Sequence, residues 1–214
     1  MLTIPSHTIV KMKNYNMIIA VFFLISCGVP TYDLKNFTLY KETKFVDSSK
    51  LRIDGIYYLI VPKECNYLND SSTHMRCFVF FENGFLFSAN FAANSRDIRK
   101  SLSEFIKSYE ESTKSQISDE IRFWGAFKIV GDTLLVQKYD RVNGVNCIVF
   151  SWNARIISNR TIEFDKSFCS DNVSSSRRFE LLQTNDKPDS INLFLTNKRI
   201  KSKLDRLYEA RHKP

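Results

Sequence analysis

Short apolar runs separated by turn-forming residues recur along the chain. Two of them, Arg76–Glu82 and Phe85–Phe91, flank the dipeptide Asn83-Gly84. Asn-Gly between apolar runs is the strongest short signal for a β-hairpin, because both central residues of a type I′ turn need φ above zero. Gly131-Asp132 separates two further runs in the same way. The sequence therefore predicts at least two tight hairpins.

Seven further segments show the same enrichment in β-branched and aromatic residues, several with period-2 alternation. They are Asp54–Val61, Arg122–Val130, Thr133–Tyr139, Cys147–Ile157, Thr161–Asp165, Arg177–Gln183 and Ile191–Thr196. About eight or nine antiparallel strands joined by hairpins indicate a mainly β barrel or sandwich.

Two amphipathic helices are predicted beside the strands. The first follows an apolar stripe at i, i+4, i+7, i+8 and i+11 from Ile98 to Tyr109, with Ser95 as the expected N-cap and Asp97 in the first turn. The second repeats apolar residues from Ile200 to Tyr208, with bases between them. Both stripes are interpreted as surfaces that pack onto the domain.

Alternation in the strand after the first helix predicts which side chains point inward. Phe123, Phe127 and Ile129 share one face and are expected inside the barrel, whereas Trp124 is expected outside, against the helix. Aromatic residues inside a small barrel either fill its core or line a ligand cavity. The sequence leaves both readings open.

The N-terminal apolar run is too short to cross a membrane. Met17–Ile25 holds nine apolar residues, which span roughly 13 Å as a helix against a hydrocarbon core of ~30 Å. Bases precede it, as in a secretory signal peptide. Translation is predicted to start at Met12, because Met12-Lys13 directly precedes this run and gives a compact leader.

The end of this run resembles the lipobox of bacterial lipoproteins. Leu24-Ile25-Ser26-Cys27 has a leucine three positions before the cysteine and a small residue just before it. The resemblance implies that Cys27 is acylated and anchors the protein in a membrane, since two or three acyl chains give a stable anchor. Gly28, in place of an aspartate, favours the outer membrane within that family. A plain signal peptide with an incidental cysteine is the alternative.

These features divide the chain into four parts. Residues 1–26 form the signal peptide, and residues 27–50 form the lipidated cysteine and a polar tether. Residues 51–196 form the β domain, and residues 197–214 form a basic C-terminal helix.

Three motifs resemble small lipocalin-like lipoproteins of Bacteroidetes. They are Asp54-Gly55-Ile56-Tyr57-Tyr58, Phe80-Phe81-Glu82-Asn83-Gly84 and Trp124-Gly125-Ala126-Phe127. The resemblance implies a lipocalin-like (calycin-like) antiparallel barrel, with Tyr57, Phe123 and Phe127 as candidate ligand-binding residues. Tyr57 replaces the tryptophan that lipocalins carry in their Gly-x-Trp motif, and the inserted helix comes between early strands rather than late in the chain.

Charge is concentrated at the C-terminus. The formal net charge is +8, and seven bases and two acids lie between Lys198 and Pro214. This run is interpreted as a solvated helix face, with contact to anionic lipid head groups as the alternative. Nucleic acid is not expected as a partner, because the aromatic residues lie on strands away from the bases.

Four cysteines follow Cys27. They are Cys65, Cys77, Cys147 and Cys169, with no C-x-x-C spacing. Exported domains permit disulfides, and buried free thiols are the alternative. Cys65 and Cys77 bracket the loop between the first two predicted strands, so they are the pair for which a disulfide is predicted.

Chemistry-bearing motifs do not point to a reaction. Of the three histidines only His74 lies in the domain, in a polar stretch read as an exposed loop, and no nucleotide, metalloprotease or hydrolase motif occurs. No catalytic residue, metal ligand or cofactor is predicted. The leading hypothesis is a membrane-anchored lipoprotein that binds a small apolar ligand or an envelope component. The alternatives are a structural or interaction subunit of an outer-membrane complex with a filled barrel, and a hydrolase.

Overall fold

A computed structural model gives the fold. It describes residues 31–42, 49–61, 73–93, 97–113, 121–143, 146–165, 177–190 and 193–213. The predicted signal peptide with Cys27, and also Cys65 and Cys169, lie outside these residues. Lipidation of Cys27 and the Cys65–Cys77 disulfide therefore stay predictions.

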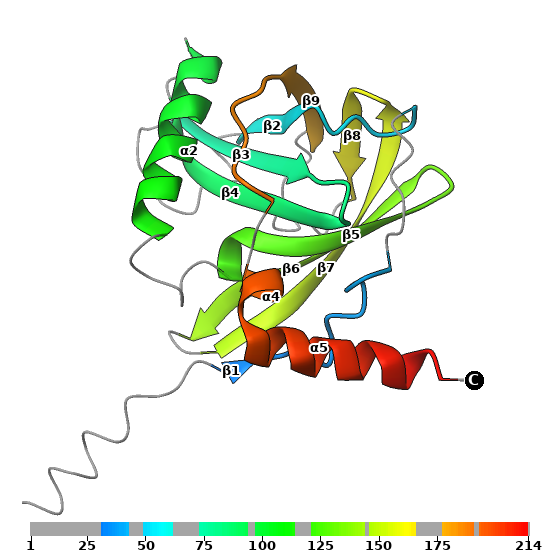
Figure 1. Cartoon of the computed structure of the whole chain (residues 1–214). Helices are drawn as coiled ribbons and strands as arrows, with labels where there is room; N and C mark the ends of the chain where they lie inside the picture. The colour runs from blue at the N-terminus through cyan, green and yellow to red at the C-terminus, as the bar shows by residue number, and fades with distance from the viewer. Residues whose placement is uncertain are drawn as a thin grey trace, which may run out of the picture.

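Eight strands of the described chain close into an antiparallel barrel (Figure 1). Each strand pairs with the next along the chain, and β9 returns to pair with β2. Closure pairs each of these strands on both sides over part of its length. The strands are β2 (Gly55–Val61), β3 (Thr73–Phe80), β4 (Phe85–Ala93), β5 (Trp124–Val130), β6 (Thr133–Asn143), β7 (Asn146–Ser158), β8 (Thr161–Phe164) and β9 (Arg178–Gln183).

The predicted fold class is confirmed. The structure is mainly β, with helix α2 (Ile98–Thr113) inserted between β4 and β5 and helix α5 (Lys198–Arg211) at the C-terminus. Both predicted tight hairpins form, and their glycines have positive φ: +80° at Gly84 and +61° at Gly131. A short extra strand, β1 (Thr31–Tyr32), pairs in parallel with the start of β7.

Aromatic and aliphatic side chains fill the barrel interior. Tyr57, Phe80 and Phe127 are each 0% exposed, and the Phe80 and Phe127 rings meet edge to face with centroids 4.9 Å apart. Phe78 stacks on Phe164 at 5.1 Å. This interior cluster comprises Leu51, Tyr57, Phe78, Phe80, Leu86, Phe127, Leu134, Val136, Ala154, Ile162, Phe164, Phe179 and Leu181.

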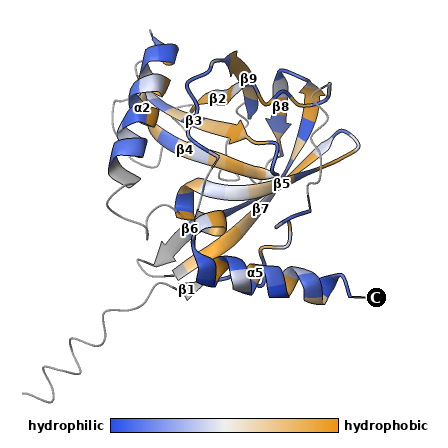
Figure 2. Ribbon diagram, viewed as in Figure 1, coloured by the Kyte–Doolittle hydropathy of each residue, from blue (hydrophilic) through white to orange (hydrophobic). Residues whose placement is uncertain are grey.

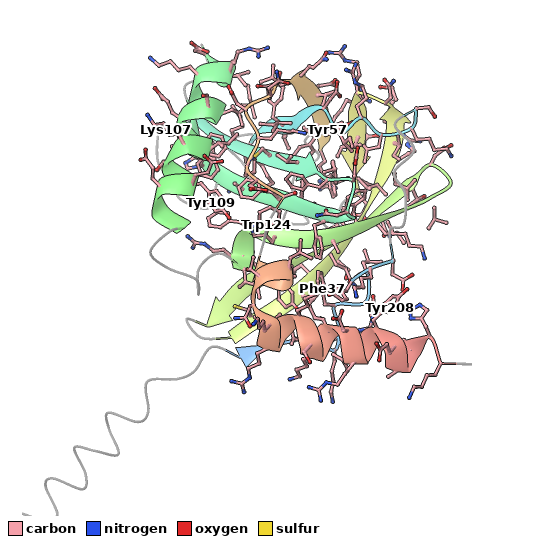
Figure 3. All side chains as sticks on the ribbon, in the orientation of Figure 1. Phe37, Tyr57, Lys107, Tyr109, Trp124 and Tyr208 are labelled. Atoms are coloured by element: carbon pink, nitrogen blue, oxygen red, sulfur yellow. The ribbon has the colours of Figure 1, made fainter. Side chains whose placement is uncertain are left out.

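A second apolar cluster covers the outer face of β3 to β7. Helix α2 packs there on β4, with Phe105 stacked on Phe91 at 4.2 Å. As predicted, Trp124 lies outside the barrel against this helix, and its Nε1 donates a buried hydrogen bond of 2.9 Å to the Tyr109 hydroxyl (Figure 3). The N-cap is Asp97 and not Ser95 as expected, and its Oδ1 accepts from the Lys100 amide at 3.0 Å.

Four other expectations differ from the structure. Phe123 is not inside the barrel: it ends a 3-10 turn, η2 (Ile121–Phe123), before the strand alternation begins, and it stacks outside on Phe87 at 5.8 Å. Residues of the predicted strand Ile191–Thr196 instead form the short helix α4 (Leu193–Thr196), because β9 already closes the barrel by pairing with β2.

The other two differences concern residues expected to be exposed. The polar segment expected to act as a tether packs onto the barrel between residues 33 and 42, where Phe37 is 0% and Tyr40 is 1% exposed. His74 lies in β3 rather than in a loop and is 6% exposed. In both places a few buried side chains determine how the segment packs, although the surrounding sequence is polar.

Candidate functional site

The hairpin of β6 and β7 projects beyond the end of β8. Strand β7 has 13 residues, but β8 has only 4 and pairs with β7 between Ala154 and Ser158. The first half of β7 therefore has β6 on one side and no β8 on the other. We call the inner face of this projecting hairpin the ledge. It consists of Lys138, Asp140, Ile148, Phe150 and Trp152, which cross-strand pairing places on one face.

Apolar side chains on the ledge are exposed. Ile148 is 38% and Phe150 is 37% exposed, although the alternation of β7 places both on the same face as Ala154, a residue of the buried interior cluster. The rings of Phe150 and Trp152 stack with centroids 5.8 Å apart. These side chains offer an apolar surface that continues from the filled interior to solvent.

Lys138 lies directly opposite Phe150 and is half-buried. Within the described part of the chain, its ammonium makes no hydrogen bond or ion pair. The pKa of Lys138 is lowered to about 8, chiefly by burial; Asp140 opposes this shift, and the cations Arg76 and Arg122 add to it. The local charge is therefore a cluster of three bases with one acid, which favours an anion.

The barrel wall that faces inward at the same end of the strands is also polar. Ser88 is 2% and His74 is 6% exposed, and Arg76 pairs across from Asn90. Arg177, just before β9, is 7% exposed. The interior thus changes from aromatic near the tight hairpins to polar and basic near the ledge.

The ledge combines exposed apolar side chains with the ammonium of Lys138. Small-molecule binding sites combine an apolar lining with a few polar groups that fix orientation. Within the described chain, no group of three His, Cys, Asp or Glu side chains could hold a metal ion. The ledge could hold the apolar part of a ligand against Phe150 and Trp152 and its anionic part against Lys138.

The three aromatic residues predicted to bind ligand do not meet at the ledge. Tyr57 and Phe127 are in the filled interior, where the Tyr57 hydroxyl donates to the Asn159 carbonyl at 2.8 Å, and burial raises the pKa of Tyr57. Phe123 lies outside the barrel. The alternation of Ile148, Phe150 and Trp152 can be read from the sequence. The sequence does not show that β8 ends before it reaches these three residues.

Cys77 is also away from the ledge. It is 2% exposed, lies on the outer face of β3, and is a free thiol within the described part of the chain. Burial raises the pKa of the Cys77 thiol to about 12. A thiol of that kind is unreactive, because the thiolate is the nucleophilic form.

A shallow groove of about 500 Å³ lies at the other end of the barrel. Its lining is mixed in charge and includes Asp54, Glu82 and Lys187. The Lys187 ammonium donates to the Ile53 carbonyl at 2.8 Å. This groove therefore holds a lysine that is already bonded, whereas the ledge holds one that has no bonding partner among the described residues.

Among the described helices, none has both the length and the apolar character needed to cross a bilayer. Comparison of the chain with protein-family models, with curated proteins and with solved structures gives no match.

Proposed function

We propose that this protein is a lipid-anchored component of the outer membrane that binds a small amphipathic ligand on the ledge. The observation that carries the proposal is the pair Ile148 and Phe150, exposed by 38% and 37% beside the half-buried Lys138. The ligand class is a molecule with an apolar chain or ring and a carboxylate, sulfate or phosphate head.

Energetics favour this class of ligand. Covering a large apolar side chain fully is worth about 1.5–3 kcal/mol, so covering the exposed parts of two such side chains and of Trp152 contributes about 2–4 kcal/mol, which alone corresponds to millimolar or weaker binding. An anionic head supplies the partner that Lys138 lacks among the described residues, and a charge-assisted bond there adds about 1.5–3 kcal/mol. A neutral head gains no such bond.

The proposed anchor fits this location. Thr31 pairs with Asn146, two residues before Ile148, and it follows Cys27 by only four positions. Four extended residues reach at most about 14 Å. Acylation of Cys27 would therefore hold the start of β7, and with it the ledge, close to the membrane surface.

A titration tests the binding. Dansyl-undecanoic acid and dansyl-undecanol share a tail and differ in the head group, and energy transfer from tryptophan reports their binding. We expect saturable binding of the acid, and weaker binding of the alcohol by roughly 10- to 100-fold. Equal affinity for both compounds would contradict the role of Lys138.

A matched pair of variants locates the site. Ile148→Ser changes an isoleucine of the ledge that is 38% exposed, and Ile60→Ser changes one on the outer face of β2 that is 40% exposed. We expect Ile148→Ser to weaken the acid by several-fold and Ile60→Ser to leave it unchanged. An equal effect of both variants would show that the probe binds elsewhere.

A structural or interaction role with a filled barrel is the second candidate. The fully buried interior aromatics, including Tyr57 and Phe127, favour it. Absence of saturable binding by a folded, stable protein would select this role over ligand binding.

A further inference from the structure

The C-terminal helix α5 is fixed to the same region from which the anchor segment emerges. Its apolar side packs on the barrel through Ile200 and Leu204, which are 8% and 1% exposed. Asp205 accepts a hydrogen bond of 2.9 Å from the Tyr40 hydroxyl and pairs with Lys41 at 2.7 Å. The helix therefore has a fixed orientation against residues 33–42.

Arg211 strengthens this attachment near the end of the helix. Its guanidinium donates to the carbonyls of Thr38 at 3.2 Å and Phe37 at 3.3 Å. Charge-assisted bonds of this kind are the stronger hydrogen bonds in proteins. In Figure 1, α5 and β1 lie together at the bottom of the molecule, away from α2.

The opposite side of α5 is basic. At 100° per residue, Lys198, Ser202 and Arg206 project away from Ile200 and Leu204. Figure 2 shows the helix as largely hydrophilic. Of its two acids, Asp205 already pairs with Lys41, so Glu209 is the acid left on the outward side. The exposed bases of this end are Lys198, Arg199, Lys201, Lys203, Arg206 and Lys213.

We infer that this basic face of α5 binds the anionic phospholipid head groups of the leaflet that holds the anchor. It spans about 21 Å, the length of 14 helical residues, and each base near such a surface adds about 1 kcal/mol, which is about fivefold in affinity. The inference rests on the proposed anchoring for its location, because β1 starts four residues after Cys27.

Two contacts on the domain thereby define its orientation. An acyl anchor alone leaves the domain free to rotate about one attachment point. A basic helix that lies on the surface adds a second contact, at the end of the barrel where β1 pairs with β7. The barrel is then held with β1 and α5 toward the lipid.

Vesicle binding tests the inference without the acyl chain. The protein used begins at Gly28, so it keeps every described residue and lacks Cys27. Flotation is measured with vesicles of pure phosphatidylcholine and with vesicles that contain 30 mol% phosphatidylglycerol. We expect binding only to the anionic vesicles, and its loss as salt is raised, because exposed charges are screened.

Two triple variants locate the surface. Lys198→Gln, Lys203→Gln and Arg206→Gln together remove three bases from α5, and we expect affinity to fall about 100-fold. The control removes three exposed bases from α2 by Arg99→Gln, Lys100→Gln and Lys107→Gln, and should leave binding unchanged. All six side chains are exposed, so both variants should unfold at the parent's temperature.

Three results would overturn the inference. They are no binding to anionic vesicles, equal binding to neutral vesicles, and an α5 variant that binds as well as the parent. The first would direct attention to an acidic protein partner. Because the tested protein has no anchor, failure here is distinct from failure of the proposed lipidation, which membrane fractionation of Cys27→Ser measures separately.

Discussion

Replacing Phe127 by alanine removes a ring from the centre of the barrel. Phe127 is 0% exposed, and its ring meets Phe80 edge to face at 4.9 Å. Buried Phe→Ala substitutions cost about 3–5 kcal/mol, which combines the lost transfer free energy with the cavity left behind. The lost ring pair, worth about 0.5–1.5 kcal/mol, places Phe127→Ala in the upper half of that range.

Urea unfolding followed by circular dichroism measures this cost. Val130→Ala is the control, because Val130 ends the same strand and is 54% exposed, and it should change the free energy of unfolding by less than about 0.5 kcal/mol. The urea dependence of that free energy should be the same in both variants if only stability has changed.

Binding of dansyl-undecanoic acid to Phe127→Ala, measured where the variant is still folded, should equal that of the parent. The ledge is formed by β6 and β7 and contains no atom of Phe127. A cost below about 1 kcal/mol would refute the filled interior. A full cost accompanied by loss of probe binding would place the ligand inside the barrel instead of on the ledge.

Three further predictions concern single residues. Lys138 binds an anion only while protonated, so the affinity for dansyl-undecanoic acid should be full below the Lys138 pKa of about 8 and fall up to tenfold per pH unit above it. The variant Lys138→Met should bind the acid weakly and without this pH dependence. A parent protein with constant affinity from pH 6 to 10 would contradict the prediction. Gly125→Ala should lower the free energy of unfolding in urea by several kcal/mol, because the added Cβ would lie 2.1 Å from the Gln137 carbonyl oxygen. Gly131→Ala should cost about 1 kcal/mol, because Gly131 has φ +61° but open space around it. Equal costs of the two variants would refute the close approach at Gly125. Cys27→Ser should release the protein from the membrane fraction, and retention after a high-salt wash would argue against the acyl anchor.

Local signals in the sequence were sufficient for most of the fold. Gly84 and Gly131 adopt the positive φ that their turns need, and both hairpins formed, although Asn83 and Asp132 lack the positive φ of a type I′ turn. The stripe from Ile98 to Tyr109 likewise predicted α2, since one apolar face needs only one sheet to cover it. These elements depend on neighbours within a few positions.

Errors arose where the outcome depends on distant parts of the chain. Phe123 fits the strand alternation, but the 3-10 turn that ends there keeps it on the helix side. Residues near Phe194 have strand character, yet the barrel closes without them and Phe194 packs on Phe37 instead, at 4.9 Å. Which strands pair decides both cases, and single-sequence patterns do not contain that information.

The candidate site was missed for the same reason. Ile148, Phe150 and Trp152 alternate as any strand with one buried face would. They form a ledge because β8 has 4 residues and β7 has 13, so their exposure depends on the relative lengths of two strands. Lys138 joins them through its register with Phe150 in the pairing of β6 with β7.

A methyl NMR titration distinguishes a ligand bound on the ledge from a ligand bound inside the barrel. Protein labelled at isoleucine δ-methyl groups is titrated with dodecanoic acid. We expect saturable shift changes at Ile148, on the ledge, and none at Ile162, which is 0% exposed in the interior. Saturable changes at Ile162 with Ile148 unaffected would contradict binding on the ledge.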